Sequence, residues 1–265
     1  MNQNIKSIGK GILFFLLWAI GIALVPIPET KIPVFWRLWA EGIPFVITLL
    51  ITGVFLKFDF YDLRLIPTRN FGKNIGIGVL TGFLWIGLAI VGIYILGGLR
   101  LGEKEIVSNL YLWFFALFLN TIMQEVLVRG YIYQSLKYQS KKIAIVFTTL
   151  LFTFLHGGAF EAGFIPVLNV VTMSLFMTAV LEYTNSLWPP IIIHYIWNGV
   201  GALIYGGVSL AEDYPSLYQM EFLGSPIISG GAVKIEGSIV VLFLNILFLL
   251  IFSYLTKKSR NKNRM

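Results

Sequence analysis

The sequence contains no cysteine, only two histidines and few charges, with 12% of its 265 residues charged. Without cysteine the chain has no disulfide, no thiolate metal site and no cysteine nucleophile. A soluble domain usually carries about twice this share of charged residues. Here the charges leave long apolar stretches uninterrupted, and 57% of all residues are hydrophobic. The composition therefore predicts a membrane protein.

The apolar stretches have the length of membrane-spanning helices, which need roughly 17–25 mostly apolar residues each. The first follows Lys6 and Lys10 and lacks a small-residue cleavage site, so we interpret it as a retained span. The third is rich in glycine, which predicts close packing against neighbouring helices. Because no repeat or linker is evident, residues 1–265 are predicted to form a single all-α, polytopic transmembrane domain. The eight predicted spans are about 11–28, 38–56, 75–99, 109–134, 143–160, 164–182, 187–206 and 238–256.

The basic residues predict the orientation of these spans. With the N-terminus inside, 14 of the 20 lysines and arginines lie in inner segments and five, Arg37 among them, in outer segments. This excess follows the positive-inside rule for an even number of spans with both termini in the cytoplasm. The net charge of +7 is therefore attributed to the membrane. We predict a multi-pass protein of the cell membrane, in contact with the lipid bilayer and with no nucleic-acid partner.

Ionisable side chains inside membrane spans are costly and usually functional. Glu125 and Arg129 are four residues apart, so they share a helix face and can form an ion pair. On their own, they fit a purely structural ion pair equally well. Both histidines also lie in apolar spans, His156 in the fifth and His194 in the seventh, where Asn198 shares the face of His194. These residues, on three helices, predict a polar cavity within the membrane.

The side chains suit the hydrolysis of an amide bond. Glu125 can act as a general base on water, with His156 positioning that water or sharing its proton. His194 and Asn198 can donate hydrogen bonds to a developing oxyanion. Glu125, His156 and His194 could instead bind zinc. Because the sequence has no His-Glu-x-x-His pattern, we prefer direct acid–base chemistry without a cofactor to a metal site.

The order and spacing of these residues resemble the CAAX protease and bacteriocin-processing family of intramembrane proteins, also called the Abi family, and its type II CAAX prenyl endopeptidases. The family pattern is Glu-Glu-x-x-x-Arg on one helix, Phe-x-x-x-His on the next and His-x-x-x-Asn on a later one. The resemblance covers about residues 110–205 and implies a protease core there. The matching residues are Gln124, Glu125, Arg129, Phe152, His156, His194 and Asn198.

The chain departs from the family pattern at Gln124, where the family has the glutamate usually assigned as the base. An amide does not accept a proton at neutral pH, so Gln124 is expected only to orient a water molecule. Three explanations stay open: Glu125 takes over as the base, the protein is a pseudoprotease, or the glutamate was replaced to trap an inactive form. Asn120, one turn earlier, either faces the cavity or forms an interhelical hydrogen bond.

Three functions fit these observations. The first is an intramembrane endopeptidase that hydrolyses a membrane-associated or lipidated, CAAX-like protein or peptide with water activated by Glu125 and His156. In it, Arg129 holds Glu125 ionised and oriented. The second is a catalytically impaired pseudoprotease that acts as a membrane-bound partner or a bacteriocin-immunity-type protein. The third is a small transporter, which ranks last because no inverted repeat is evident.

Overall fold

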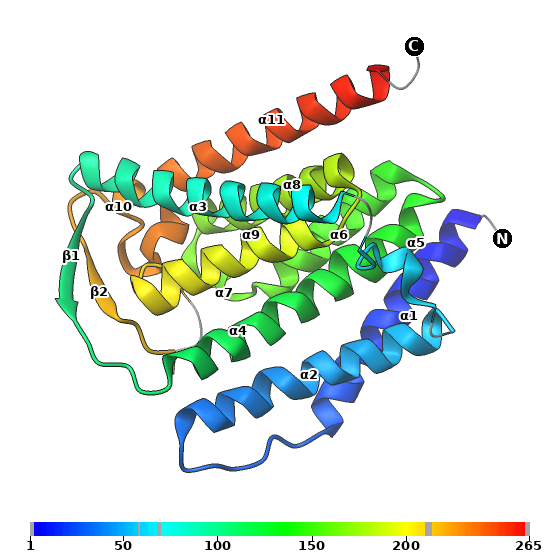
Figure 1. The fold of residues 1–265 in the computed structure, drawn as a ribbon, viewed down its shortest axis with the longest axis horizontal. Coiled ribbons are helices and arrows are strands. Elements are labelled where there is room, and N and C mark those ends of the chain that lie inside the picture. Colours follow the sequence, from blue (N-terminus) through cyan, green and yellow to red (C-terminus); the bar gives the residue numbers. More distant parts are fainter. Residues whose placement is uncertain (1–2, 58, 68–69, 210–213, 263–265) are drawn as a thin grey trace. The chain divides into compact units, whose positions relative to one another are not determined.

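A computed structural model describes residues 3–57, 59–67, 70–209 and 214–262. Nearly all the regular structure is helical, which confirms the predicted all-α membrane bundle (Figure 1). Arg69 and Arg264, two basic residues assigned to the inner side, lie outside the described residues. The predicted count of eight spans and the cytoplasmic termini stay predictions. Over the described residues, six segments are long and apolar enough to cross a membrane: Ile5–Leu24, Pro33–Phe55, Phe71–Ile95, Leu110–Lys137, Phe164–Thr184 and Gly231–Lys262.

The chain divides into two compact units, each made of two separate stretches of sequence. Unit 1 comprises Met1–Arg69 and Asn109–Thr148, and unit 2 comprises Asn70–Ser108 and Thr149–Met265. Helix α6 (Lys141–Leu155) begins in unit 1 and ends in unit 2. The prediction of a single domain is not decided by this division and stays a prediction.

In unit 1, helix α2 contacts both α1 and α4. It begins at Pro33, because proline suits the first turn of a helix. The predicted span began at about 38, so Arg37 lies within the helix and not in an outer segment, as we had assigned it. The other elements of unit 1 are α1 (Gln3–Leu24), α2 (Pro33–Phe55), the 3₁₀ helix η1 (Phe60–Leu63), α4 (Leu110–Glu125), the π-helical segment η2 (Val126–Ile132) and α5 (Tyr133–Lys137).

Unit 2 contains the remaining helices and a two-stranded antiparallel ribbon in which Leu99 pairs with Phe222 (Figure 1). The third predicted span ended at 99, but its helix ends at Ile95, because Gly97 has φ 72° and turns the chain into the ribbon. The elements are α3 (Phe71–Ile95), β1 (Leu99–Lys104), α7 (Gly158–Ala162), α8 (Phe164–Thr184), α9 (Trp188–Asn198), the π-helical η3 (Gly199–Ile204), β2 (Tyr218–Phe222), α10 (Pro226–Ser229), the 3₁₀ helix η4 (Gly231–Gly237) and α11 (Ile239–Lys262).

The two helices nearest the histidines are short. Helix α6 has 15 residues, so it rises only about 22 Å at about 1.5 Å per residue, less than a bilayer core of about 30 Å. It ends at Leu155, ahead of Gly157 and Gly158. His156 therefore lies just beyond the helix, whereas the sequence had placed it inside the fifth span. Helix α9 has 11 residues and begins at Trp188 with proline in its first turn, where proline suits a helix.

Two glycines bring α3 against α9, as the glycine-rich composition of the third span predicted (Figure 1). A Cβ on Gly78 would lie 3.0 Å from Cβ of Ile192. A Cβ on Gly82 would lie 2.9 Å from Cδ1 of Ile196. Larger residues at these two positions would push the helices apart. The close approach thus fixes α9, the helix on which His194 and Asn198 are carried.

Candidate active site

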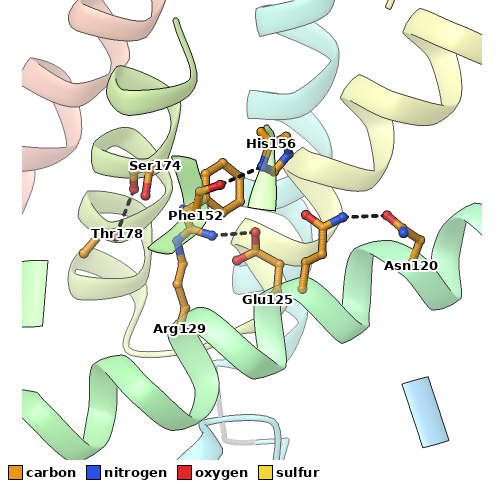
Figure 2. Close-up of polar contacts among 8 residues, drawn as sticks. Asn120, Glu125, Arg129, Phe152, His156, Ser174 and Thr178 are labelled. Atoms are coloured by element: carbon orange, nitrogen blue, oxygen red, sulfur yellow. Dashed lines mark hydrogen bonds and ion pairs between the residues drawn. The ribbon is translucent and has the colours of Figure 1, made fainter. Parts of the chain in front are cut away.

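In unit 1 the residues of the first motif lie where α4 passes into the π-helical segment η2. Arg129 Nη1 lies 2.7 Å from Glu125 Oε1, and both side chains are fully buried (Figure 2). The four-residue spacing predicted this ion pair, and the structure confirms it. A charge buried in an apolar segment is tolerated when an opposite charge pairs with it. Glu125 is therefore held as a hydrogen-bond acceptor by a fixed cation.

Gln124 belongs to a second series of polar contacts in unit 1. Its Nε2 donates to Oδ1 of Asn120 at 2.8 Å, and Nδ2 of Asn120 donates to Oε2 of Glu41 at 2.7 Å. Glu41 also pairs with Arg37 at 3.1 Å. Of the two interpretations of Asn120, the structure supports the interhelical hydrogen bond, here from α4 to α2.

Glu41 was missed by the sequence analysis, although a signal for it exists. It is an acidic residue inside the predicted span 38–56, and such residues are functional candidates by default. Arg37 stands four residues before it, which is the spacing of a helical ion pair. Because the span was drawn from 38, Arg37 was assigned to a loop and the pair went unnoticed. Both side chains are buried.

Unit 2 brings the two histidines together around Phe152. The ring centroids of His156 and His194 lie 6.3 Å apart. The ring of Phe152 is 4.3 Å from that of His156 and 5.8 Å from that of His194. The second and third motifs are therefore neighbours in space, although the two histidines are 38 positions apart in the sequence.

The backbone fixes how the imidazole of His156 is used. Its Nδ1 lies 2.8 Å from the carbonyl oxygen of Phe152 (Figure 2). A carbonyl oxygen only accepts, so Nδ1 carries the proton and donates. In the neutral ring, Nε2 is then the basic nitrogen. The side chain of His156 is half-buried.

The third motif lies on one face of α9. His194 and Asn198 are one helical turn apart and both are buried. Asn198 is the last residue of α9, and the π-helical η3 begins immediately after it. π-helical segments inside longer helices are frequent at functional sites. Both motif helices, α4 and α9, pass into such a segment within a few residues of the predicted site residues.

A cavity of about 390 Å³ in unit 2 is lined by His156. Glu236 also lines it, and its Oε2 accepts the backbone N–H of Ser209 at 2.9 Å. Glu236 was not among the predicted site residues, because nothing local in the sequence links it to His156. The rest of the lining is small or apolar: Gly158, Ala159, Ala162, Pro166, Val170, Ala232 and Val233.

The six predicted site residues are thus divided between the units. Unit 1 carries Gln124, Glu125 and Arg129, the last two in direct contact. Unit 2 carries the remaining three, His156, His194 and Asn198. Their catalytic roles stay predictions. The zinc alternative does too: within the described part of the chain, no group of three or more histidine, aspartate or glutamate side chains has the arrangement of a metal site.

Comparison with known proteins relates one stretch of the chain to a family. Neither the curated proteins nor the solved structures provide a match. The matched stretch runs from shortly before α4 to the beginning of η3. Residues 106–200, which include all six predicted site residues, match the family model described as "Type II CAAX prenyl endopeptidase Rce1-like", and this match confirms the resemblance that the motifs indicated.

Proposed function

We propose that the protein is an intramembrane endopeptidase that hydrolyses a peptide bond in a membrane-associated or lipidated protein. The family match supports a CAAX-type intramembrane protease in general, and hence a peptide or protein substrate in a membrane context. The observation that carries the proposal is the pairing of His156 with His194 around Phe152, beside a cavity. We place the protein in the cell membrane, where a lipidated substrate is held against the bilayer.

In the proposed reaction His156 takes the proton of the attacking water. Its Nε2 is the basic nitrogen of the neutral ring, because Nδ1 donates to Phe152. The water oxygen attacks the carbonyl carbon of the substrate and an oxyanion forms. When the carbon–nitrogen bond breaks, His156 returns the proton to the leaving amine. One histidine thus acts first as base and then as acid, so no net proton is gained or lost.

His194 and Asn198 are proposed to stabilise the oxyanion. Both side chains can donate a hydrogen bond, and both are buried, where such a donor has more effect than it has in water. Their common face on α9 would let the two donors converge on one oxygen atom. Because Gly78 and Gly82 hold α9 against α3, the donors are fixed before the reaction begins.

Glu125 and Arg129 are proposed to act as a charged pair. Glu125 was expected to be the base, but its full burial and its contact with Arg129 favour a role in positioning and electrostatics. Gln124, which cannot take a proton, would orient the water.

Cleavage by purified protein in lipid nanodiscs tests the proposal. The substrates are matched peptides with and without a prenyl group, each assayed with and without chelator. We expect His156→Ala and His194→Ala each to lower kcat by about 100-fold or more while the protein stays folded, since a general base and an oxyanion donor each contribute about this much. Arg100→Ala, which removes an exposed ion pair with Glu221, is the control and should cleave normally. Full activity of either histidine variant would contradict the proposal.

A second candidate is a pseudoprotease that binds its partner peptide without cutting it, as an immunity-type protein would. The amide of Gln124 at the family's base position favours it, since the hydrogen bond to Asn120 shows that this amide is accommodated. Peptide binding with no product in any lipid or at any pH would support this candidate. Steady turnover by the unmodified protein would exclude it.

A further inference from the structure

A chain of hydrogen bonds in unit 1 has a fixed direction. Arg37 carries only donors, so Oε1 of Glu41 accepts from it at 3.1 Å. Oε2 of Glu41 accepts the Nδ2–H of Asn120 at 2.7 Å. The oxygen of Asn120 is then turned toward Gln124 and accepts its Nε2–H at 2.8 Å. A carboxylate, which only accepts, thus orients two successive amides.

The end of this chain is the amide oxygen of Gln124. It is buried, and no hydrogen-bond partner for it is found over the described residues. A buried acceptor without a partner is unfavourable, so a donor is expected to bind there. We propose that Glu41, acting through Asn120, is a positioning residue that presents the Gln124 oxygen to the O–H of the reacting water. This role of the water rests on the proposed function.

The direction of these hydrogen bonds makes the residues at 41 and 124 depend on each other: a carboxylate at 41 requires a donor at 124. With glutamate at 124, the oxygen of Asn120 would face a second carboxylate, at a position where it now accepts a hydrogen bond. Turning the Asn120 amide over would place that oxygen against Glu41 instead. Either orientation sets two acceptors against each other. The single substitution Gln124→Glu is therefore unfavourable in this chain.

Exchanging the two residues removes the conflict. In the double variant Glu41→Gln/Gln124→Glu, Arg37 donates to the amide oxygen at position 41. The amide N–H at position 41 donates to the oxygen of Asn120. The N–H of Asn120 then donates to the carboxylate at 124. Every hydrogen bond is kept and the number of carboxylates is unchanged, while the two hydrogen bonds that Asn120 forms reverse their direction. The carboxylate at 124 now holds the water and also accepts its proton.

The single substitution Glu41→Gln has a different consequence. An amide at 41 lets both neighbouring amides turn over, so that position 124 presents N–H in place of oxygen. An N–H does not accept a hydrogen bond from the water. We expect kcat to fall by about 10-fold with little change in KM, because peptide binding does not use this group.

The test is a double-mutant cycle with two readouts, thermal unfolding in nanodiscs and peptide cleavage. We expect Gln124→Glu to lower the unfolding midpoint by several degrees and the exchanged pair to recover most of that loss. The exchanged pair should also show a kcat about 5-fold above that of Gln124→Glu, because only in the exchanged pair does Asn120 donate a hydrogen bond that orients the carboxylate at 124. The matched control combines Gln124→Glu with Glu182→Gln, which alters an ion pair to Arg260 elsewhere. That combination should recover nothing.

Additive midpoints of the two single substitutions would overturn the inference. So would a coupling that persists after Asn120→Ala, because the proposed coupling runs through Asn120. If Gln124→Glu fails to fold, the exchanged pair decides: a folded double variant supports the inference and an unfolded one overturns it. If none of the proteins cleaves peptide, the proposed function and the role of the water fail together, whereas the midpoints still decide whether Glu41 and Gln124 depend on each other.

Discussion

The two units differ in how their polar side chains are satisfied. In unit 1, Glu41 and Glu125 are each paired with an arginine four residues away, and all four side chains are buried. In unit 2 the candidates for proton transfer are two histidines, one of which lines a cavity together with Glu236. A paired, buried carboxylate is a fixed charge, whereas a histidine beside a cavity can exchange a proton with a ligand. This difference supports the proposal that proton transfer belongs to unit 2, whereas unit 1 supplies fixed charges.

Removing a fixed charge in unit 1 should give the largest change in stability. Arg129→Met leaves the fully buried Glu125 without this cation, and breaking such a pair typically costs about 3–5 kcal/mol. Replacing both residues, as in Glu125→Leu/Arg129→Met, should restore most of the loss, because no buried charge then remains. Thermal unfolding in nanodiscs measures both effects.

His156→Ala is the contrasting variant from unit 2. Its side chain is half-buried, so the free energy of unfolding should change far less than it does in Arg129→Met. If Arg129→Met were as stable as the unmodified protein, the pair would not be the fixed charge that the comparison assumes.

Local sequence patterns predicted the parts of the site that depend on local geometry. The ion pair of Glu125 with Arg129 and the common face of His194 and Asn198 follow from the four-residue repeat of a helix. Glu41 had the same signal, but the helix boundary was drawn five residues too late. Element ends are hard to place from sequence, because helices fray and capping depends on context.

Other features depend on contacts between distant parts of the chain. Glu236 follows His156 by 80 residues in the sequence, so no local pattern could place both on one cavity. The π-helical segments η2 and η3 were not predicted either, because each directly continues the helix before it and no local pattern marks the change of hydrogen bonding. The two-stranded ribbon of β1 and β2 was missed because its strands were interpreted as a span end and a loop.

The contact of α3 with α9 offers a smaller and more local perturbation. Gly82→Ala places a Cβ 2.9 Å from Ile196 and 3.3 Å from Cα of Ile193, so the helices must shift. Overpacking of this kind costs about 1–3 kcal/mol, and displacing α9 should also lower kcat through His194. Gly87→Ala on the same helix is the matched control, since no atom lies within 4 Å of its new Cβ. It should be neutral or slightly stabilising, because alanine favours a helix over glycine. Equal destabilisation by both would show that α9 is not held by close packing at Gly82.

The smallest effect is expected at Glu236, which tests whether the cavity of unit 2 receives the substrate. Glu236→Gln removes the ionisable carboxyl but keeps an oxygen that can accept the N–H of Ser209. For a peptide with a lysine near the cleaved bond, KM should rise about 5-fold, as expected for the loss of one charge-assisted contact of about 1 kcal/mol. The same peptide with norleucine in place of lysine should have the same KM with Glu236→Gln as with the unmodified protein. Ser209→Ala is the control at the same wall, because the hydrogen bond to Glu236 comes from the backbone of Ser209 and survives the substitution. If the lysine peptide had the same KM with Glu236→Gln as with the unmodified protein, the substrate would bind outside this cavity. The cavity would then not be the place where His156 meets the substrate.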